Sequence, residues 1–462
     1  MENTNRTENF LKHVLSKLKT KDMKSLKMLL DITNEVDILN MMQEISDERQ
    51  AIVYRLLSKD KALFVFERLD TSHQQKLIHS FTNEEATEII TELDPDDRVR
   101  LFDELPAAFV KKMLSSLSAE QREMTNLLMG YEQQTAGRIM TPEYMRISRN
   151  MTVEQALEKV KATAKDKEMI YTIYVTDDTK KLEGVVPLRE LWIADPNTKV
   201  EDMMHQISAK VLTSTDQEEV ARLLQKLNWL AAPVVDNEDR LVGIITIDDA
   251  MDILEAEATE DIFDHAGLAH VSGSEAMRSE IMVKGTTWKI WKVRLPFLII
   301  TLLGGFFAGF IIEGFEEVLE SVTIVAFFIP LIMDMGGSVG TQSTTVFARG
   351  VVLGHINTKK FMSYLLKETW IGLSMGILVG ILGGFAVAFL WPGEPMLGLA
   401  VGSALVFTMT LSAFLGFFIP FILVKMKVDQ AAGSAPIITS IKDITGLLIY
   451  FLAVSTFMSY IL

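Results

Sequence analysis

The sequence predicts a multidomain membrane protein with an all-α superhelical N-terminal domain, a tandem pair of α/β units, a linking helix and a five-helix transmembrane domain. Three observations predict this fold class. Helix-start residues recur every 12 residues near the N-terminus, a strand-turn-strand pattern is repeated 59 residues later, and five long apolar runs follow residue 294. We place the four parts at residues 1–130, 131–264, 265–294 and 295–462.

The first domain follows the period of 12. Each helix-start residue comes directly after an apolar residue, and the series is Ser46, Ser58, Asp70, Thr82, Asp94, Pro106 and Ser118. Thr82 and Ser118 precede Glu85 and Gln121 by the spacing of a capping box. The pattern predicts short helices of about two turns stacked in a right-angled or superhelical array. Such arrays usually serve as scaffolds and binding surfaces.

The two α/β units are related by a second repeat. Tyr171–Val186 aligns with Leu230–Ile245, and amphipathic helices are predicted before them at Val153–Ala162 and Gln217–Leu227. Each unit therefore has the order helix, strand, polar turn, strand and helix.

These units resemble a tandem pair of CBS domains, a fold that commonly senses adenine nucleotides or ions. In the second copy, the resemblance places Thr246 and Asp248 at ribose and phosphate contacts, with ATP as the expected nucleotide. In the first copy, Arg189 and Glu190 occupy the matching segment, but Pro187 stands where the hydroxyl would be.

An acidic helix is predicted to leave the second unit. Residues 248–264 hold eight acids and no base, and like charges at three- and four-residue spacing destabilise a helix by a few tenths of a kcal/mol each. Divalent cations bound between the carboxylates would offset this cost. A second cluster, with Asp94, Asp96 and Asp97, is expected to face this helix. A solvated acidic helix is the alternative.

The five apolar runs predict transmembrane helices. Each is long enough to cross about 30 Å of hydrocarbon, and soluble proteins rarely contain five consecutive helices that are apolar on every face. The runs are Leu295–Ile312, Ser321–Ala348, Thr369–Gly393, Pro395–Val424 and Gln430 to the end. The connecting segment before them carries aromatic and basic residues that suit the headgroup layer, although a plain linker helix would share this pattern.

Loop charges predict the orientation. Basic residues flank the spans on one side, at Lys289, Lys292, Arg294, Arg349, Lys359, Lys360, Lys367, Lys425 and Lys427. The N-terminal part is therefore expected in the cytoplasm and the C-terminus outside the cell. The absence of cysteine and of an apolar N-terminal signal agrees with this. Most of the net charge of −16 precedes the first span, which favours cations over nucleic acid as ligands.

Polar residues within the spans indicate an aqueous path. Asp443 lies inside the fifth span, where a charge costs about 2.5 to 3.5 kcal/mol. Asp429 would mark the cytosolic end of the path, and an ion pair between Asp443 and Lys442 is the alternative.

The second span contains the stretch PLIMDMGGSVGTQS. We expect Gly336 and Gly337, with Gly340, to break the helix so that backbone approaches the path. Oxygens for a hydrated cation are then expected from Ser338, Thr341, Gln342 and Ser343, and Asp334 adds a carboxylate.

Taken together, these parts resemble the MgtE family of magnesium channels over nearly the whole chain. The most specific marks are ILEAEATEDI, the stretch from Pro330 to Ser343, and the run from Lys427 to Phe451. The resemblance implies that two chains form one pore, lined by the second and fifth spans, in which Asp443 holds hydrated Mg²⁺. It also implies closure by Mg²⁺ bound at cytosolic acids: Asp249, Asp252, Glu257, Glu260 and Asp261, with Asp216 and Glu218 as further candidates. Ser338 departs from the family, which has asparagine there.

We therefore expect a homodimeric, Mg²⁺-gated and Mg²⁺-conducting channel for magnesium uptake in the cell (inner) membrane. An enzyme is not expected, because the sequence has no Walker loop, zinc spacing or evident nucleophile and base. Ser338 and Asp334 leave open a cation exchanger or a channel for Co²⁺, Mn²⁺ or Ca²⁺. A non-conducting, membrane-anchored ion sensor is a further alternative, against which the intramembrane Asp443 argues.

Overall fold

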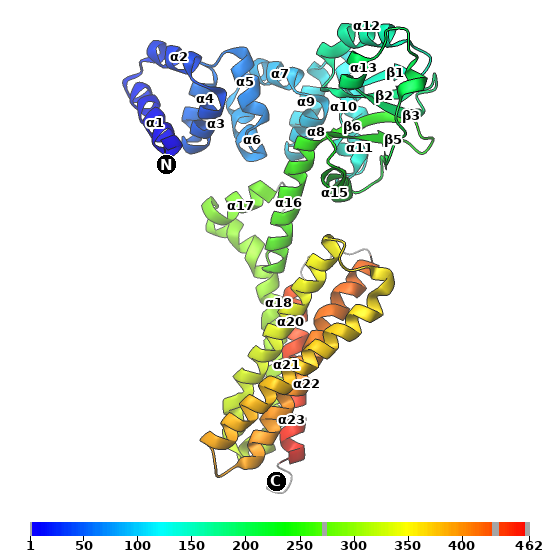
Figure 1. Ribbon diagram of the computed structural model, residues 1–462. Helices are drawn as coiled ribbons and strands as arrows, with labels where there is room; N and C mark the ends of the chain where they lie inside the picture. Colours follow the sequence, from blue (N-terminus) through cyan, green and yellow to red (C-terminus); the bar gives the residue numbers. More distant parts are fainter. Residues whose placement is uncertain (1, 270–274, 427–433, 458–462) are drawn as a thin grey trace. The chain divides into compact units, whose positions relative to one another are not determined.

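The computed structural model describes residues 2–269, 275–426 and 434–457. The chain divides into two compact units (Figure 1). The first unit runs to residue 257, and the second consists mainly of the residues from 280 onward.

Ten helices form the N-terminal array of the first unit. They are α1 Glu2–Thr20, α2 Met23–Ile32, α3 Glu35–Glu44, α4 Asp47–Tyr54, α5 Lys59–Glu67, α6 Thr71–Ser80, α7 Asn83–Glu92, α8 Pro95–Glu104, α9 Ala107–Ser116 and α10 Ala119–Met129. All seven predicted start residues are N-caps, and both predicted capping boxes form. Asp22 and Asn34 extend the period of 12 towards the N-terminus.

The array has a second period, of two helices. Helices two apart in the chain contact each other, as α4 does α6 and α6 does α8. The fourth residue of each even-numbered helix from α4 onward donates to carbonyls at the end of the preceding helix. These residues are Gln50, Gln74, Arg98 and Arg122, with shortest bonds of 2.6, 2.7, 2.6 and 2.8 Å. They satisfy carbonyls that a helix end leaves without intrahelical partners.

Two three-stranded sheets follow, with the same topology. Their elements are α11 Ala136–Ile139, β1 Tyr144–Ser148, α12 Val153–Thr163, η1 Ala164–Asp166, β2 Met169–Thr176, β3 Leu182–Pro187, α13 Leu188–Ile193, α14 Val200–Met203, β4 Val211–Leu212, α15 Gln217–Leu227, β5 Ala231–Val235, β6 Leu241–Thr246 and α16 Ile247–His265. In each sheet the first pair of strands is parallel and the second antiparallel. The predicted repeat is therefore confirmed.

Gly184 and Gly243 occupy equivalent positions in the two copies of the repeat, and each is required by close packing. A Cβ at Gly184 would lie 2.9 Å from the carbonyl oxygen of His205, and one at Gly243 would lie 2.9 Å from that of Thr141. A backbone segment crosses each strand too closely for a side chain.

Helix α8 joins the array to the second α/β unit. Val99 of α8 is buried in the same core as residues of α11, α15, β5 and β6. Arg138 of α11 forms an ion pair with Asp103 of α8. The first turn of α8 is thereby held near the acidic helix α16, which decides the geometry of the candidate site.

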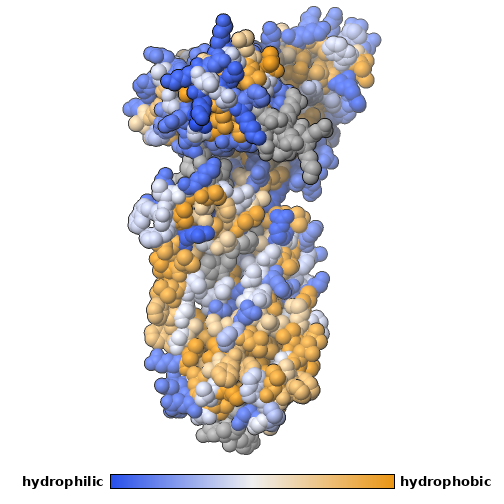
Figure 2. Space-filling model, turned by 90° about the vertical axis from the view of Figure 1, so that its left-hand side faces the viewer, coloured by the Kyte–Doolittle hydropathy of each residue, from blue (hydrophilic) through white to orange (hydrophobic). Residues whose placement is uncertain are grey.

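The second unit is a bundle of long helices. Its elements, with α17 before them, are α17 Glu275–Lys284, α18 Thr287–Glu313, α19 Glu316–Ser321, η2 Thr323–Phe328, α20 Ile329–Val352, η3 Thr358–Lys360, α21 Phe361–Leu390, α22 Pro395–Lys425 and α23 Ser434–Phe457. Within the described residues, five stretches are long and apolar enough to cross a membrane, and hydrophobic side chains cover much of the bundle surface seen in Figure 2. The chain is thus a multi-pass membrane protein.

The predicted break in the second span is wrong, because α20 is one continuous helix. Its glycines allow close packing instead. Gly336 packs against Thr408 and Ser412 of α22, and the backbone at Gly340 is approached by Gly416. Small residues at such positions let helices come together while the backbone stays hydrogen-bonded.

Candidate functional site

Three carboxylates from three segments of the first unit meet at one place. Asp96 comes from the first turn of α8, Glu168 from the residue before β2, and Asp249 from the first turn of α16. One carboxylate oxygen of each lies within 4.8 Å of the others. We call this group the interdomain cluster, because it joins the helical array to both α/β units.

Burial is the main electrostatic cost of the interdomain cluster. Asp96 is buried, and its Oδ1 has no hydrogen-bond partner among the described residues. Desolvation and then the neighbouring carboxylates raise the pKa of Asp96 well above its usual value. Desolvation also raises the pKa of Glu168 to about 8 and that of Asp249 to about 6. A buried carboxylate with an unpartnered oxygen, close to two further carboxylates, fits a divalent cation, whose charge would favour the ionised forms.

Arg100 of α8 lies beside the interdomain cluster. Its guanidinium is 3.9 Å from Asp249 and 3.8 Å from Asp252, and it donates to Asp97. The structure therefore brings the two predicted acidic segments together, with one arginine between them.

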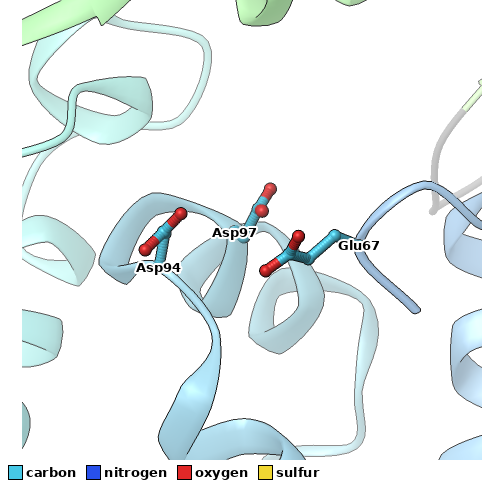
Figure 3. A group of neighbouring side chains, drawn as sticks. All are labelled: Glu67, Asp94 and Asp97. Carbon is cyan, nitrogen blue, oxygen red and sulfur yellow. The ribbon is translucent and has the colours of Figure 1, made fainter. Parts of the chain in front are cut away.

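A second carboxylate group lies within the helical array. Glu67 at the end of α5 faces Asp94 and Asp97 of the α8 N-terminus, and carboxylate oxygens of the three lie within 4.8 Å of one another (Figure 3). Burial, followed by the charges of the two aspartates, raises the pKa of Glu67 to about 7. Asp94 makes no side-chain capping bond, unlike Asp70. Its carboxylate thus remains available to a cation. We call this group the array cluster.

Sequence reasoning missed Glu67, Glu168 and Arg100. Glu67 is separated from Asp94 by two whole helices, and Glu168 belongs to the other α/β unit. No spacing in the sequence links either residue to its cluster.

The remaining predicted cytosolic acids have local roles or lie elsewhere. Asp216 accepts a bond from the backbone N–H of Glu218 at 2.9 Å, and Glu218 pairs with Arg222. Glu257 accepts a bond of 2.7 Å from Gln217. Glu260 and Asp261, in the last turns of α16, belong to the second unit.

The predicted nucleotide contacts are partly committed to other partners. Thr246 is buried and its hydroxyl donates to Asp249 at 2.8 Å. Asp248 and Arg189 are exposed, and Glu190 lies 2.6 Å from a ring nitrogen of His205.

Helix α20 carries a polar stripe on its exposed face. Its residues follow spacings of three and four, which place them on one side of a helix; they are Asp334, Ser338, Thr341, Gln342 and Thr345, all exposed. The opposite face is buried against α22 and α23. Charged and polar side chains inside a membrane generally face water or protein and not lipid. We therefore expect the stripe to face water or protein and not lipid.

The other predicted path residues lie off the stripe or outside the described part. Gly336 is on the packed face, and a Cβ at Gly337 would meet open space. Asp443 on α23 is half-buried. Asp429 lies outside the described residues.

Comparisons with known proteins cover nearly the whole chain. Family models match for the MgtE intracellular N domain at residues 33–134, for CBS domains at 136–191 and 200–256, and for the MgtE divalent cation transporter at 329–453. The magnesium transporter MgtE of Thermus thermophilus is 36% identical over 93% of this chain and 94% of its own length. That of Bacillus subtilis is 33% identical over 93% of each chain.

A solved structure is also similar. The cytosolic domain of the Mg²⁺ channel MgtE in complex with ATP has 37% identity and a TM-score of 0.49, and the match covers 52% of this chain and 98% of that one. The sequence matches extend through the array, the CBS pair and the membrane helices in the same order. The chain belongs to the MgtE family of divalent cation transporters.

Proposed function

We propose that the protein is a homodimeric Mg²⁺ channel of the cell (inner) membrane that admits magnesium and closes when Mg²⁺ binds its cytosolic carboxylates. The polar stripe of α20 is the observation that carries this proposal. Curated relatives named as magnesium transporters, at 33 to 36% identity, support the choice of ion.

The stripe offers ligands of the kind that a hydrated cation needs. Mg²⁺ dehydrates reluctantly, so hydroxyl, amide and carboxylate oxygens can bind it through its water shell. Asp443 of α23 adds a charge that costs about 2.5 to 3.5 kcal/mol at bilayer depth and is retained in spite of that cost.

One protomer leaves the stripe uncovered, which supports a dimer. A second copy facing the first would enclose the two stripes in protein and water, away from lipid. The basic loops support a cytoplasmic N-terminal part and, after five spans, an external C-terminus.

The two carboxylate clusters support the gate. Two ionised carboxylates whose oxygens lie within 4.8 Å of each other repel by at least about 3.5 kcal/mol at an effective dielectric constant of 20. Bound Mg²⁺ would supply the positive charge that turns this repulsion into attraction. Asp96 and Asp249 would then hold α8 against the first turn of α16, and α16 continues along the chain towards the membrane helices. Uptake would thus be limited by the ion that it delivers.

Flux measurements on the full chain in proteoliposomes test the proposal. We expect uptake of Mg²⁺ by the unmodified protein and loss of uptake in Asp443→Ala. Asp178→Ala, an exposed acid in a cytosolic turn, serves as the control and should transport normally. Undiminished flux in Asp443→Ala would show that Asp443 does not line the path. Faster uptake of Co²⁺, Mn²⁺ or Ca²⁺ than of Mg²⁺ in the same assay would show that Mg²⁺ is not the preferred ion.

The gate is tested separately, by limited proteolysis of the same protein. Protection of the cytosolic part should rise with Mg²⁺ and rise less in Asp96→Asn. Equal protection of the two proteins would show that the interdomain cluster takes no part in closure.

A further inference from the structure

A lysine is buried inside the membrane unit beside the proposed ion path. Lys442 is 2% exposed, whereas its neighbour Asp443 is half-buried. A positive charge at this depth is as costly as a negative one, so its retention calls for a role.

The packing around Lys442 forms a slot for its side chain. A methyl group at Gly340 of α20 would meet the last two carbons and the nitrogen of the lysine, so the lysine end lies directly against this glycine and would have to shift to admit a larger residue. Gly416 of α22 approaches the carbonyl oxygen of the same glycine, and its own Cβ would lie 2.5 Å from that oxygen. The lysine of α23 thus lies against α20 at the residue where α22 also packs closely on α20.

The lysine and the aspartate point to different sides of α23. Adjacent residues of a helix are about 100° apart. Lys442 is directed to the buried face of α20, opposite the polar stripe, while Asp443 keeps part of its surface exposed. Lys442 therefore cannot block the path physically, but its charge acts on it across α20.

The carboxylates of α20 and α23 indicate how the positive charge of Lys442 could affect ion binding. Besides Asp443, Asp334 on the stripe supplies a second carboxylate, six residues or about 9 Å along the axis from Gly340. Two protomers would place four carboxylates around one path, and without the lysines no buried positive charge would oppose them. A divalent ion would enter such a site readily and leave it slowly, whereas conduction requires binding weak enough for exit.

We propose that Lys442 is a specificity-determining counter-charge that offsets Asp334 and holds the Mg²⁺ affinity of the path low enough for rapid exit. This inference rests on the proposed function, because it assumes that α20 and α23 line the path. A unit charge about 10 Å from a divalent ion changes its binding about fourfold even with the screening of bulk water. The change is larger where protein and lipid reduce that screening.

Mg²⁺ uptake by the full chain in proteoliposomes tests the inference through affinity and rate. Lys442→Met, which keeps the length and removes the charge, should lower the half-saturating Mg²⁺ concentration at least fourfold and reduce the maximal rate. Lys442→Arg should stay within twofold of the unmodified protein. Asp334→Asn should shift half-saturation in the opposite direction, and the double variant with Lys442→Met should return it towards the original value.

Each outcome decides between charge and packing. If Lys442→Met leaves half-saturation unchanged, or if Lys442→Arg behaves like Lys442→Met, the lysine is only a packing element and the inference is wrong. If Lys442→Met does not fold, the Asp334→Asn variant tests the inference alone. An unchanged half-saturating concentration in Asp334→Asn would mean that the Asp334 charge does not affect Mg²⁺ affinity, and the inference would be wrong. Absence of Mg²⁺ uptake by the unmodified protein would instead overturn the proposed function, which separates the two failures.

Discussion

Neutralising one carboxylate of the interdomain cluster should have opposite effects on stability with and without Mg²⁺. Asp249→Asn keeps the size of the side chain and removes its charge. Asp249 has a pKa of about 6 in the folded state, above the ordinary value of 3.8. At about pH 7, the ionised side chain therefore destabilises the folded state by up to about 3 kcal/mol, compared with a side chain whose pKa does not change on folding. This pKa already includes the opposing effect of Arg100, whose guanidinium lies 3.9 Å from Asp249.

We therefore expect Asp249→Asn to stabilise the cytosolic unit by about 2 kcal/mol in EDTA, or by about 4 to 8 °C in thermal midpoint. With Mg²⁺ the order should reverse, because the variant has lost a ligand and gains less from the ion. Differential scanning calorimetry of the full chain, in EDTA and in excess Mg²⁺, measures both effects. Asp178→Asn, in an exposed turn, should change neither.

The pH dependence gives an independent check. Because the folded state holds the Asp249 proton more tightly than the unfolded state, stability in EDTA should fall as the pH rises from about 4 to about 6. Asp249→Asn should lack that part of the fall. A lower midpoint of the variant in EDTA, or equal stabilisation of both proteins by Mg²⁺, would refute the reasoning.

Two further predictions concern packing. Gln74→Ala should destabilise the array by about 0.5 to 1.5 kcal/mol in urea unfolding, since it removes the 2.7 Å hydrogen bond to the carbonyl of Phe66. The exposed Gln43→Ala should change the stability by less than about 0.5 kcal/mol, and equal effects would contradict the capping role. Gly340→Ala should lower the thermal midpoint of the membrane unit, because its methyl group meets Lys442, whereas Gly337→Ala meets open space and should not. A stable Gly340→Ala would mean that the lysine moves freely.

Local patterns in the sequence predicted much of the fold. Capping residues and apolar positions act within one or two helical turns, so Thr82 and Ser118 were sufficient to place α7 and α10. The α/β repeat and the five spans were predictable for the same reason. Glycine in a membrane span is ambiguous, because it permits both a break and close packing. Only the neighbours of Gly336 and Gly340 decide for packing.

The candidate sites were less predictable because they depend on contacts distant in the sequence. Asp94, Asp96 and Asp249 could be selected from local acid density. Glu67 and Glu168 are single acids, and their clusters form only when α5 packs near α8 and when the array packs on the CBS pair, respectively. The orientation of the stripe on α20 was likewise decided by which side of that helix α22 and α23 cover.

The two-helix period of the array limits how this domain can change in length. In α4, α6 and α8 the fourth residue is a long hydrogen-bond donor, while in α7 and α9 it is Ala86 or Val110, both buried. Removing one helix would bring donors to positions that need apolar residues and leave carbonyls uncapped. Insertions and deletions of 24 residues would preserve the pattern, so the domain can evolve, or be engineered, in pairs of helices.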